Sequence, residues 1–374
     1  MKIGFDAKRA VQNNTGLGNY SRYLIEILSE YYSDNEYLLF VPEKKENPRL
    51  QTLQSRENIS FVYPSGLSGL FPSFWRTTGI VTDLKRYSPG IFHGLSGELP
   101  IGIAKTGIKT VVTVHDLIFL RYPEYYKPWD RIIYTKKFRY ACENADKIIA
   151  ISECTKKDII SFFKIPEKKI TVVYQGCHPD FRKKVTDEKK REVAERYNLP
   201  SKYVLYVGSI EPRKNLLPAV KALQNLEQDI HLVAIGKKTP YQTETEQYAE
   251  RSGVSHRFHV FNQVPFDDLP ACYQLASAFV YPSFFEGFGI PVIEALSSGV
   301  PVIAATGSCL EEAGGPGSIY VDPMDEEALA VQINKILSDG GLAQKMVEDG
   351  KKYIQKFGNE VIASDIMRIY NTVL

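Results

Sequence analysis

Short apolar runs alternate with amphipathic stretches along nearly the whole chain, and this alternation constrains the fold more than any other feature. The apolar runs have the length of buried strands, and the stretches between them are long enough for helices. This order of elements is typical of parallel α/β layers. We expect strands at residues 2–5, 37–41, 59–63, 91–93, 110–114, 147–151, 171–174, 203–207, 231–235, 258–261, 278–281 and 302–304. We expect helices around residues 19–32, 74–87, 129–144, 153–163, 215–226, 267–276, 290–298, 325–338 and 359–374.

The length of the chain predicts two domains. Its 374 residues exceed what one hydrophobic core comfortably serves. Residues 175–187 contain Gly176, Pro179 and a charged run, which is the composition of a linker. We therefore expect a first domain over residues 1–178 and a second over residues 179–358. Ligands of parallel α/β sheets bind at the carboxyl ends of the strands, so functional residues are expected in the loops that follow strands.

Composition disfavours several classes of protein. A net charge of +2 and a pI of about 8.1 do not favour nucleic acid as a partner. No apolar run approaches the roughly 18 residues of a membrane span, and the opening MKIGFDAKRA does not have the pattern of a signal peptide. The five cysteines are widely scattered, show no metal-ligand pairing and suit a reducing compartment. We therefore expect a cytoplasmic protein.

The charge is unevenly distributed along the chain. Residues 121–169 carry twelve Lys and Arg against seven Asp and Glu. A solvated helix surface explains this excess, and so does a contact with the anionic inner face of a membrane. The sequence leaves both interpretations open.

The stretch YPSFFEGFGIPVIEALSSG at residues 281–299 carries the strongest functional pattern. It follows an apolar strand and combines a glycine-containing turn with the start of a helix, the arrangement at which α/β sheets bind phosphates. Glu286 lies in the turn, and Glu294 follows after seven residues, in the first turns of the helix. Alternatively, Glu286 caps the helix and Glu294 is a solvated side chain. The flanking glycines favour a bound ligand that faces both carboxylates.

A second cluster lies at residues 208–215, GSIEPRKN, between a predicted strand and a predicted helix. Arg213 can grip phosphate oxygens with a planar fork, and Lys214 acts as a compact charge. A helix N-terminus with two adjacent cations is suited to a diphosphate. A solvated turn is the alternative interpretation.

Two weaker signals lie in the first half of the chain. Gly16 and Gly18 come just before a predicted helix, where backbone N–H groups reach a ligand or simply begin the helix. His115 follows the predicted strand 110–114, and a histidine at this position is a structural hydrogen-bonding residue or part of a site. There is no DxD motif, which disfavours a donor diphosphate bridged by a metal.

These blocks resemble the retaining GT-B glycosyltransferases of family 4, strongest at residues 107–124, 203–216 and 278–304, in their mannosyltransferase-like branch. The resemblance implies two facing Rossmann-like domains with an interdomain cleft, and a last helix, 359–374, that packs back on the first domain. It also implies that Glu286 lies near the donor sugar, that Glu294 holds the ribose and that His115 lies beside the sugar. Ser209 stands where the family commonly has Arg, Lys214 keeps the Lys position, and we expect Arg213 to supply the missing charge. The donor is further expected to meet Gly16, Gly18, Val264 (within the nucleobase segment 261–265), Gly287, Phe288, Gly289 and Ile290.

The resemblance implies transfer of a hexose from a nucleoside diphosphate sugar without metal or other cofactor. Mannose from GDP-mannose is the first choice, and the acceptor is a hydroxyl of a glycan or of a lipid-linked sugar. Acceptor contacts are expected from residues 66–76 and 94–100. Two other classes stay open: another GT-B enzyme, such as a sugar-nucleotide epimerase or a phosphorylase, and a non-catalytic subunit that binds sugar nucleotides.

Overall fold

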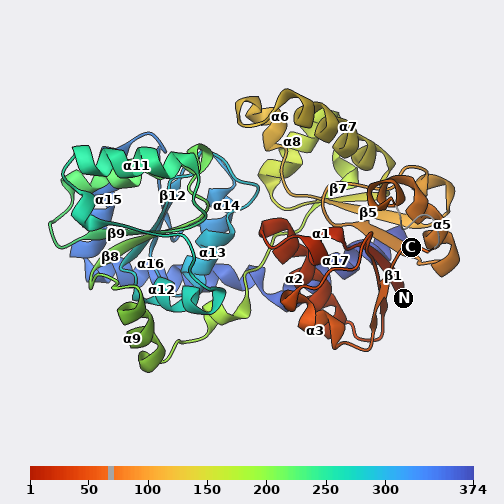
Figure 1. Cartoon of the computed structure of the whole chain (residues 1–374), viewed down its shortest axis with the longest axis horizontal. Coiled ribbons are helices and arrows are strands. Elements are labelled where there is room, and N and C mark those ends of the chain that lie inside the picture. Colours follow the sequence, from red (N-terminus) through yellow and green to blue (C-terminus); the bar gives the residue numbers. More distant parts are fainter. Residues whose placement is uncertain (66–70) are drawn as a thin grey trace. The chain divides into compact units, whose positions relative to one another are not determined.

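In the computed structural model, which describes residues 1–65 and 71–374, the chain divides into two compact units (Figure 1). Unit 1 comprises Met1–Gln175 and Gly358–Leu374, and unit 2 comprises Gly176–Phe357. The chain leaves unit 1 three residues before the predicted boundary at residue 178. It returns to unit 1 next to the predicted last helix.

The described part of unit 1 contains one seven-stranded parallel sheet, in the order β3-β2-β1-β4-β5-β6-β7. Neighbouring strands pair in parallel register, for example Phe5 with Leu39 and with His93. The strands are β1 (Lys2–Asp6), β2 (Glu36–Phe40), β3 (Ile59–Val62), β4 (Ile91–Gly94), β5 (Lys109–Val114), β6 (Lys147–Ala150) and β7 (Ile170–Val172).

Helices cover both faces of this sheet. Alternate strand residues enter two separate cores, so Leu39 belongs to one and Leu38 and Phe40 to the other. The helices of unit 1 are α1 (Lys8–Gln12), α2 (Gly16–Tyr31), α3 (Gln51–Gln54), α4 (Pro72–Phe74), α5 (Ile80–Tyr87), α6 (Ile118–Arg121), α7 (Pro128–Asn144), α8 (Glu153–Phe163) and α17 (Asn359–Val373). Figure 1 shows α2 and α17 beside each other, and both contribute to the core that contains Leu39. Tyr370 on α17 also hydrogen-bonds His93 on β4 (2.7 Å), which ties the last helix to the sheet.

Unit 2 repeats the architecture with six parallel strands, in the order β10-β9-β8-β11-β12-β13. The strands are β8 (Tyr203–Val207), β9 (His231–Ile235), β10 (Phe258–Phe261), β11 (Ala278–Tyr281), β12 (Val302–Ala305) and β13 (Ile319–Val321). The helices are α9 (Asp187–Arg196), α10 (Leu217–Ala222), α11 (Pro240–Arg251), α12 (Leu269–Leu275), α13 (Ile290–Ser297), α14 (Leu310–Gly314), α15 (Glu326–Ser338) and α16 (Gly340–Tyr353).

Each strand predicted from the sequence has a counterpart in the structure. The predicted helix 74–87 is interrupted, because a π-helical turn over Trp75–Gly79 joins α4 to α5. Several elements were not predicted from the sequence, among them β13, α9, α11 and α16. β13 has only three residues, while α9 and α11 are mostly polar and begin at the side-chain caps of Thr186 and Thr239.

Each sheet has one point at which the strand order reverses. In unit 1 this point lies between β1 and β4, and in unit 2 between β8 and β11. The loops that follow two such strands diverge and leave a crevice outside the carboxyl ends, where α/β proteins bind ligands. The fold therefore directs attention to the loops after β1, β4, β8 and β11.

Candidate functional site

The loops after β8 and β11 are bonded to each other at the switch point of unit 2. The backbone N–H of Phe284 donates to the carbonyl of Arg213 (2.9 Å), and the side-chain amide of Asn215 donates to the carbonyl of Pro282 (3.1 Å). Asn215 adopts a left-handed backbone conformation (φ 53°), which turns the chain from the first loop into α10. These hydrogen bonds hold the two loops together, and the two loops carry the predicted site residues.

Glu286 is held between two cations within this pair of loops. One carboxylate oxygen lies 3.1 Å from Nη1 of Arg213, and the other lies 3.5 Å from Nζ of Lys214. Tyr281, the last residue of β11, accepts from Lys214 (2.9 Å) and donates to Glu286 (3.0 Å). Ser283 also donates to Glu286 (3.0 Å). The structure therefore brings together three of the predicted site residues, Glu286, Arg213 and Lys214, with Tyr281 between Lys214 and Glu286.

The electrostatics of this cluster keep Glu286 ionised. Burial by itself raises the pKa of a carboxyl group, but Lys214 and Arg213 outweigh it and hold the pKa of Glu286 below its ordinary value. Burial likewise opposes the charge of Arg213, and Glu286 together with Glu211 raises the pKa of that guanidinium. Glu211 pairs with Arg213 at 2.7 Å from a more exposed position. The cluster is a fixed array of charges at the carboxyl ends of two strands.

Glu294 lies on α13 and has a different environment from that of Glu286. Its carboxylate accepts a hydrogen bond from the buried hydroxyl of Tyr273 (2.8 Å). Burial raises the pKa of Glu294 to about 7, although Tyr273 and Lys214 act in the opposite direction. Glu294 therefore changes its charge near neutral pH, whereas Glu286 does not.

The turn between the glutamates approaches α14 closely. Gly289 caps α13 with φ 123°, and a Cβ there would lie 2.8 Å from the side chain of Leu310. Phe288 is buried against Phe357 (ring centroids 5.4 Å apart), so only its backbone is left for a ligand. Gly287 is also buried, and Ile290 is the first residue of α13.

Two further predicted donor contacts lie on the same edge of the unit 2 sheet. Ser209 follows β8 and is half-buried; its carbonyl accepts from the hydroxyl of Tyr206 (3.3 Å). Val264 is half-buried in the loop that follows β10, an edge strand separated from β8 by β9. Both residues therefore belong to loops that start at the carboxyl ends of parallel strands.

His115 lies in unit 1, directly after β5, and both of its ring nitrogens are used within the protein. Nε2 lies 2.9 Å from the carbonyl of Leu95 and Nδ1 lies 3.1 Å from the side-chain amide of Gln175. A carbonyl only accepts, so Nε2 carries the proton and Nδ1 accepts from Gln175. Burial and the charge of Arg9 lower the pKa of His115 to about 4, against the effect of the Leu95 bond. This neutral ring, hydrogen-bonded through both nitrogens, connects the loop after β4 to Gln175, the residue at which the chain leaves unit 1.

The structure corrects the predicted start of the helix next to Gly16 and Gly18. The helix predicted from residue 19 begins at Gly16, so both glycines belong to its first turn rather than to a loop. The backbone N–H of Gly18 donates to the side chain of Asn13 (3.2 Å), and a Cβ at Gly18 would lie 1.7 Å from the Asn13 carbonyl. Close packing of the chain before α2 therefore accounts for Gly18, while Gly16 is exposed with open space around it.

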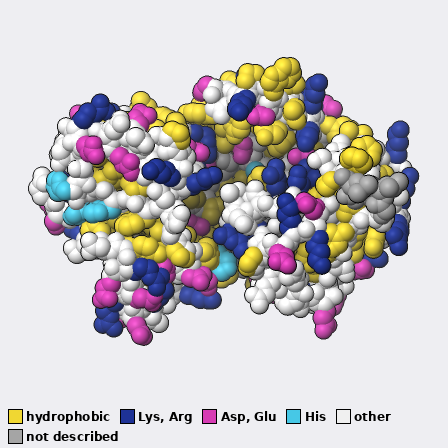
Figure 2. Space-filling model, viewed as in Figure 1, with side chains coloured by type: hydrophobic (Ala, Val, Ile, Leu, Met, Phe, Trp, Pro, Cys, Tyr) yellow, Lys and Arg dark blue, Asp and Glu magenta, His cyan; other side chains and the backbone are white. Residues whose placement is uncertain are grey.

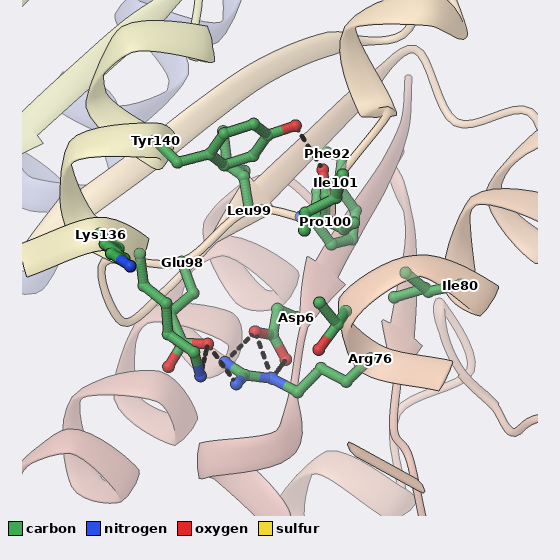
Figure 3. Close-up of a pocket in the computed structure, with 12 residues that line it drawn as sticks. Asp6, Arg76, Ile80, Phe92, Glu98, Leu99, Pro100, Ile101, Lys136 and Tyr140 are labelled. Atoms are coloured by element: carbon green, nitrogen blue, oxygen red, sulfur yellow. Dashed lines mark hydrogen bonds and ion pairs between the residues drawn. The ribbon is translucent and has the colours of Figure 1, made fainter. Parts of the chain in front are cut away.

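Residues from both segments predicted to contact an acceptor line a cavity in unit 1. Residues 66–70 of the first segment lie outside the described residues. Arg76 and Thr77 line the cavity from one side of the switch point, and residues 98–101 line it from the loop after β4 (Figure 3). The cavity encloses about 200 Å³.

Helix α7 in unit 1 exposes several apolar side chains, which together form an apolar surface. Trp129, Ile132 and Ile133 are 76%, 47% and 48% exposed, respectively, and Figure 2 shows hydrophobic side chains gathered over this helix together with Lys and Arg. Across residues 1–65 and 71–374, none of the helices combines the length and apolarity that a membrane crossing requires.

Comparison with known proteins assigns both halves of the chain to sugar-transferring enzymes. The family described as Glycosyltransferase Family 4 matches residues 15–181, and the family described as Glycosyl transferases group 1 matches residues 187–353. O-antigen chain mannosyltransferase B of Escherichia coli is 28% identical over 384 residues, which cover 99% of each chain. This chain is a glycosyltransferase of the family 4 type.

Other relatives agree with this assignment. The serotype-specific mannosyltransferase WbdA of Escherichia coli is 30% identical over 266 residues. The matched region covers 68% of this glycosyltransferase and only 32% of WbdA. Among solved structures, a glycosyltransferase from Rickettsia africae superposes with a TM-score of 0.78 at 20% identity, covering 100% of this chain and 98% of that one. Alr3699/HepE of Anabaena, solved in complex with UDP and glucose, superposes with a TM-score of 0.76 at 17% identity over 100% of both chains. These likenesses establish the GT-B fold.

Several residues that contact the predicted site residues in the structure were not predicted from the sequence. Tyr281 and Tyr273 each bond one of the paired glutamates, and Gln175 bonds His115. A signal was available for Tyr281, since it is the last residue of a strand and directly precedes the glutamate block. Nothing in the sequence separates Tyr273 from an ordinary core aromatic residue.

Proposed function

We propose that this glycosyltransferase moves a hexose, with retention of its anomeric configuration, from a nucleoside diphosphate sugar to a hydroxyl of a glycan or lipid-linked glycan precursor. The observation that carries the proposal is the cluster at the β8–β11 switch point, where Arg213 and Lys214 flank Glu286. In this arrangement Glu286 hydrogen-bonds the hydroxyls of the sugar, and the two cations face the diphosphate. Glu294, one turn into α13, binds the ribose.

The chemistry proposed for this cluster is displacement on one face of the sugar. The bond from the anomeric carbon to the diphosphate breaks while the acceptor oxygen attacks from the same face, and the departing diphosphate takes the acceptor proton. Negative charge grows on the leaving group, so fixed donors aimed at it lower the barrier. The proposed donors are Lys214, Arg213 and the backbone N–H of Ile290, the first residue of α13. We propose that these groups stabilise the diphosphate without a metal ion.

Mannose from GDP-mannose is the proposed donor. The support is that the Escherichia coli relatives are named as mannosyltransferases. The complex of HepE with UDP shows that a protein of the same fold binds a different base, so the base needs a direct measurement.

A thermal-shift panel tests the proposal, with GDP, UDP, ADP, dTDP and the matching sugar nucleotides, each with and without EDTA. A ligand at about a hundred times its dissociation constant stabilises the fold by roughly 2.7 kcal/mol. We expect GDP and GDP-mannose to raise the melting temperature most, with no effect of EDTA. A preference for another base would replace GDP-mannose but keep the enzyme class. No shift with any nucleotide would favour a phosphorylase. Binding without transfer or hydrolysis would favour a non-catalytic subunit, and release of free nucleotide without an acceptor would favour an epimerase.

We further propose that the apolar surface of α7 rests on an anionic membrane, which would bring the enzyme to lipid-linked acceptors at the cytoplasmic face. Trp129 and Ile133 would enter the interface, and neighbouring cations such as Arg131 and Lys136 would meet the headgroups. Sedimentation with vesicles containing phosphatidylglycerol should remove the protein from solution, and pure phosphatidylcholine vesicles should not. Trp129→Ser should abolish sedimentation. Val331→Ser, an exposed apolar residue of unit 2, should not change it. Equal sedimentation of both variants would overturn this part of the proposal.

A further inference from the structure

We infer that the exposed ring of Phe266 stacks on the nucleobase of the donor and makes the site prefer purine nucleotides over pyrimidine nucleotides. This inference rests on the proposed function. It adds a specificity-determining residue to the donor site, and this residue lies just outside the predicted nucleobase segment 261–265.

Phe266 follows directly after the segment that is expected to meet the nucleobase. That segment begins at the last residue of β10 and contains Val264, the predicted donor contact. Phe266 opens the short 3-10 turn Phe266–Asp268, which leads into α12. The residue therefore lies on a loop at the carboxyl end of a parallel strand, which is the edge of the sheet where α/β proteins bind ligands.

The exposure of Phe266 sets it apart from the other aromatic residues of unit 2. All of residues 176–357 are described, and Phe266 is the only Phe or Tyr among them that is exposed (37%). The other phenylalanines and tyrosines of this unit are buried or half-buried. A single exposed apolar side chain is ordinary on a protein surface, so the neighbours of Phe266 decide whether it serves a ligand.

Two aromatic neighbours hold the ring of Phe266. Its centroid lies 4.8 Å from that of His178 and 5.7 Å from that of Phe181, with interplanar angles of 81° and 89°. Perpendicular rings at this separation are a favoured geometry for aromatic pairs. Phe181 is buried, whereas His178 is exposed. The ring of Phe266 is therefore fixed in place before a ligand arrives, so that stacking on it costs little side-chain ordering.

The same rings connect Phe266 to the proposed ribose contact. Phe181 also packs against Tyr273, with 5.4 Å between the ring centroids, and the hydroxyl of Tyr273 donates to Glu294 (2.8 Å). Phe266 is thus only two ring contacts away from the tyrosine that bonds Glu294. In a nucleotide the base is attached directly to the ribose. A ribose that binds Glu294 therefore brings its base close to the exposed ring of Phe266.

Stacking on this ring explains a preference for purines. Every base has a π face, and one base stacked on an aromatic side chain gains roughly five- to a hundredfold in affinity. A purine has two fused rings and covers more of the phenyl ring than a pyrimidine does, so it gains more from the contact. The proposed donor, GDP-mannose, contains a purine.

Calorimetry with the full-length protein tests the inference, with GDP and UDP as nucleotides and inorganic pyrophosphate as a probe without a base. Phe266→Leu keeps an apolar side chain against His178 and Phe181 but removes the π face. We expect this variant to weaken GDP binding roughly fivefold, UDP binding less, and pyrophosphate binding not at all. Tyr31→Leu, at a 43% exposed position of unit 1, should leave all three affinities unchanged.

Phe266→Trp gives a direct readout of the contact between ring and base. The two tryptophans of the chain, Trp75 and Trp129, both lie in unit 1. The indole introduced by Phe266→Trp is therefore the only one in unit 2. We expect GDP to quench its fluorescence in a saturable way and pyrophosphate to leave it unchanged. The wild-type protein shows how much quenching comes from Trp75 and Trp129.

Four results would overturn the inference. They are an unchanged GDP affinity in Phe266→Leu, equal weakening of GDP, UDP and pyrophosphate in that variant, UDP binding to the wild-type protein as tight as GDP binding, and GDP binding to Phe266→Trp without quenching. The first, second and fourth leave the proposed function intact, and the third replaces only its base. If no nucleotide binds the wild-type protein, the proposed donor site is refuted and the inference with it.

Discussion

Each of the two units contains its own parallel sheet with one reversal of strand order. The charged side chains at the two reversal points nevertheless differ: one trio has two cations and the other has two carboxylates. In unit 2 two cations, Arg213 and Lys214, flank the carboxylate of Glu286. In unit 1 two carboxylates, Asp6 and Glu98, flank the guanidinium of Arg76. The members of both trios are mostly buried, whereas the outer partners Glu211 and Lys137 are 34% and 44% exposed.

The side chains that meet at each switch point, rather than the fold, therefore distinguish the two units. A trio with an extra cation favours an anionic ligand such as a diphosphate. The fold supplies the same crevice twice, and the side chains that reach it decide which ligand each crevice accepts.

The largest effect is expected from Lys214→Ala. The variant removes one of the two cations from the unit 2 trio, and we expect turnover to fall roughly ten- to a thousandfold, as for loss of a donor that stabilises transition-state charge. Steady-state transfer rates at saturating donor measure this effect. Lys202→Ala, which removes a half-buried cation paired with Glu227 and Asp229, should leave turnover unchanged. Unchanged turnover in Lys214→Ala would contradict the assignment of the trio.

Tyr281→Phe tests whether the unit 2 trio depends on its bridging hydroxyl. The change removes the acceptor for Lys214 and the donor to Glu286 without changing the ring. We expect the free energy of unfolding to fall by about 1–3 kcal/mol, because two charged groups each lose a hydrogen bond. Urea unfolding measures it, with Tyr31→Phe at a 43% exposed position as the control. Equal stability of the two variants would show that the bridge is not needed.

The pH dependence of nucleotide binding separates the two glutamates of unit 2. The pKa of Glu294 is about 7 in the folded protein, above its ordinary value of 4.5. The folded state therefore holds the proton more tightly than the unfolded state does. This contribution to stability is complete below pH 4.5 and is lost as the pH rises to 7.

Nucleotide binding should follow the opposite course, since the ionised carboxylate is the better acceptor for ribose hydroxyls. We expect affinity to rise roughly tenfold between pH 6 and pH 8, measured by calorimetry. Glu294→Gln should remove the part of the rise that comes from this residue and leave any part that comes from the phosphates. An unaltered pH profile in Glu294→Gln would refute the role of Glu294.

The smallest effect is expected from Gly16→Ala, which tests whether Gly16 of unit 1 contacts the donor. Gly16 has open space for a Cβ, so Gly16→Ala should raise the free energy of unfolding by about 0.4–1 kcal/mol. If its backbone approaches the donor, as the family resemblance implies, the added methyl group should also weaken binding of the sugar nucleotide. Gly340→Ala is a matched control, because Gly340 also begins a helix with open space around it. Equal affinities in the two variants would remove Gly16 from the donor site.

Much of the fold could be predicted because buried strands in parallel sheets are short, continuous and apolar. β8 and β11 are such runs, and their predicted bounds agree with the structure. The prediction failed where this signal was absent. β13 is a half-buried three-residue edge strand, and α11 is mostly polar, so packing against neighbouring elements rather than local pattern decides both.

The candidate site divides in the same way. Glu286 and Lys214 were found from the sequence, because glycine-containing turns after predicted strands marked their positions. Tyr281 and Tyr273 were missed because buried tyrosines look like core residues until their hydroxyl partners are seen. The predicted donor contact of Gly18 stays a prediction, and the structure adds that close packing against Asn13 requires a glycine there.

The amino-acid sequence was enough to predict two parallel α/β units, with turns in the second that are typical of phosphate sites, because apolar periodicity and turn chemistry are local properties. The tertiary structure alone decided which charges meet. Asp6, Arg76 and Glu98 are far apart along the chain and come together only because β4 pairs with β1, beyond two strands that lie between them in sequence. Strand order is a property of the whole sheet, and so is the buried trio that it assembles.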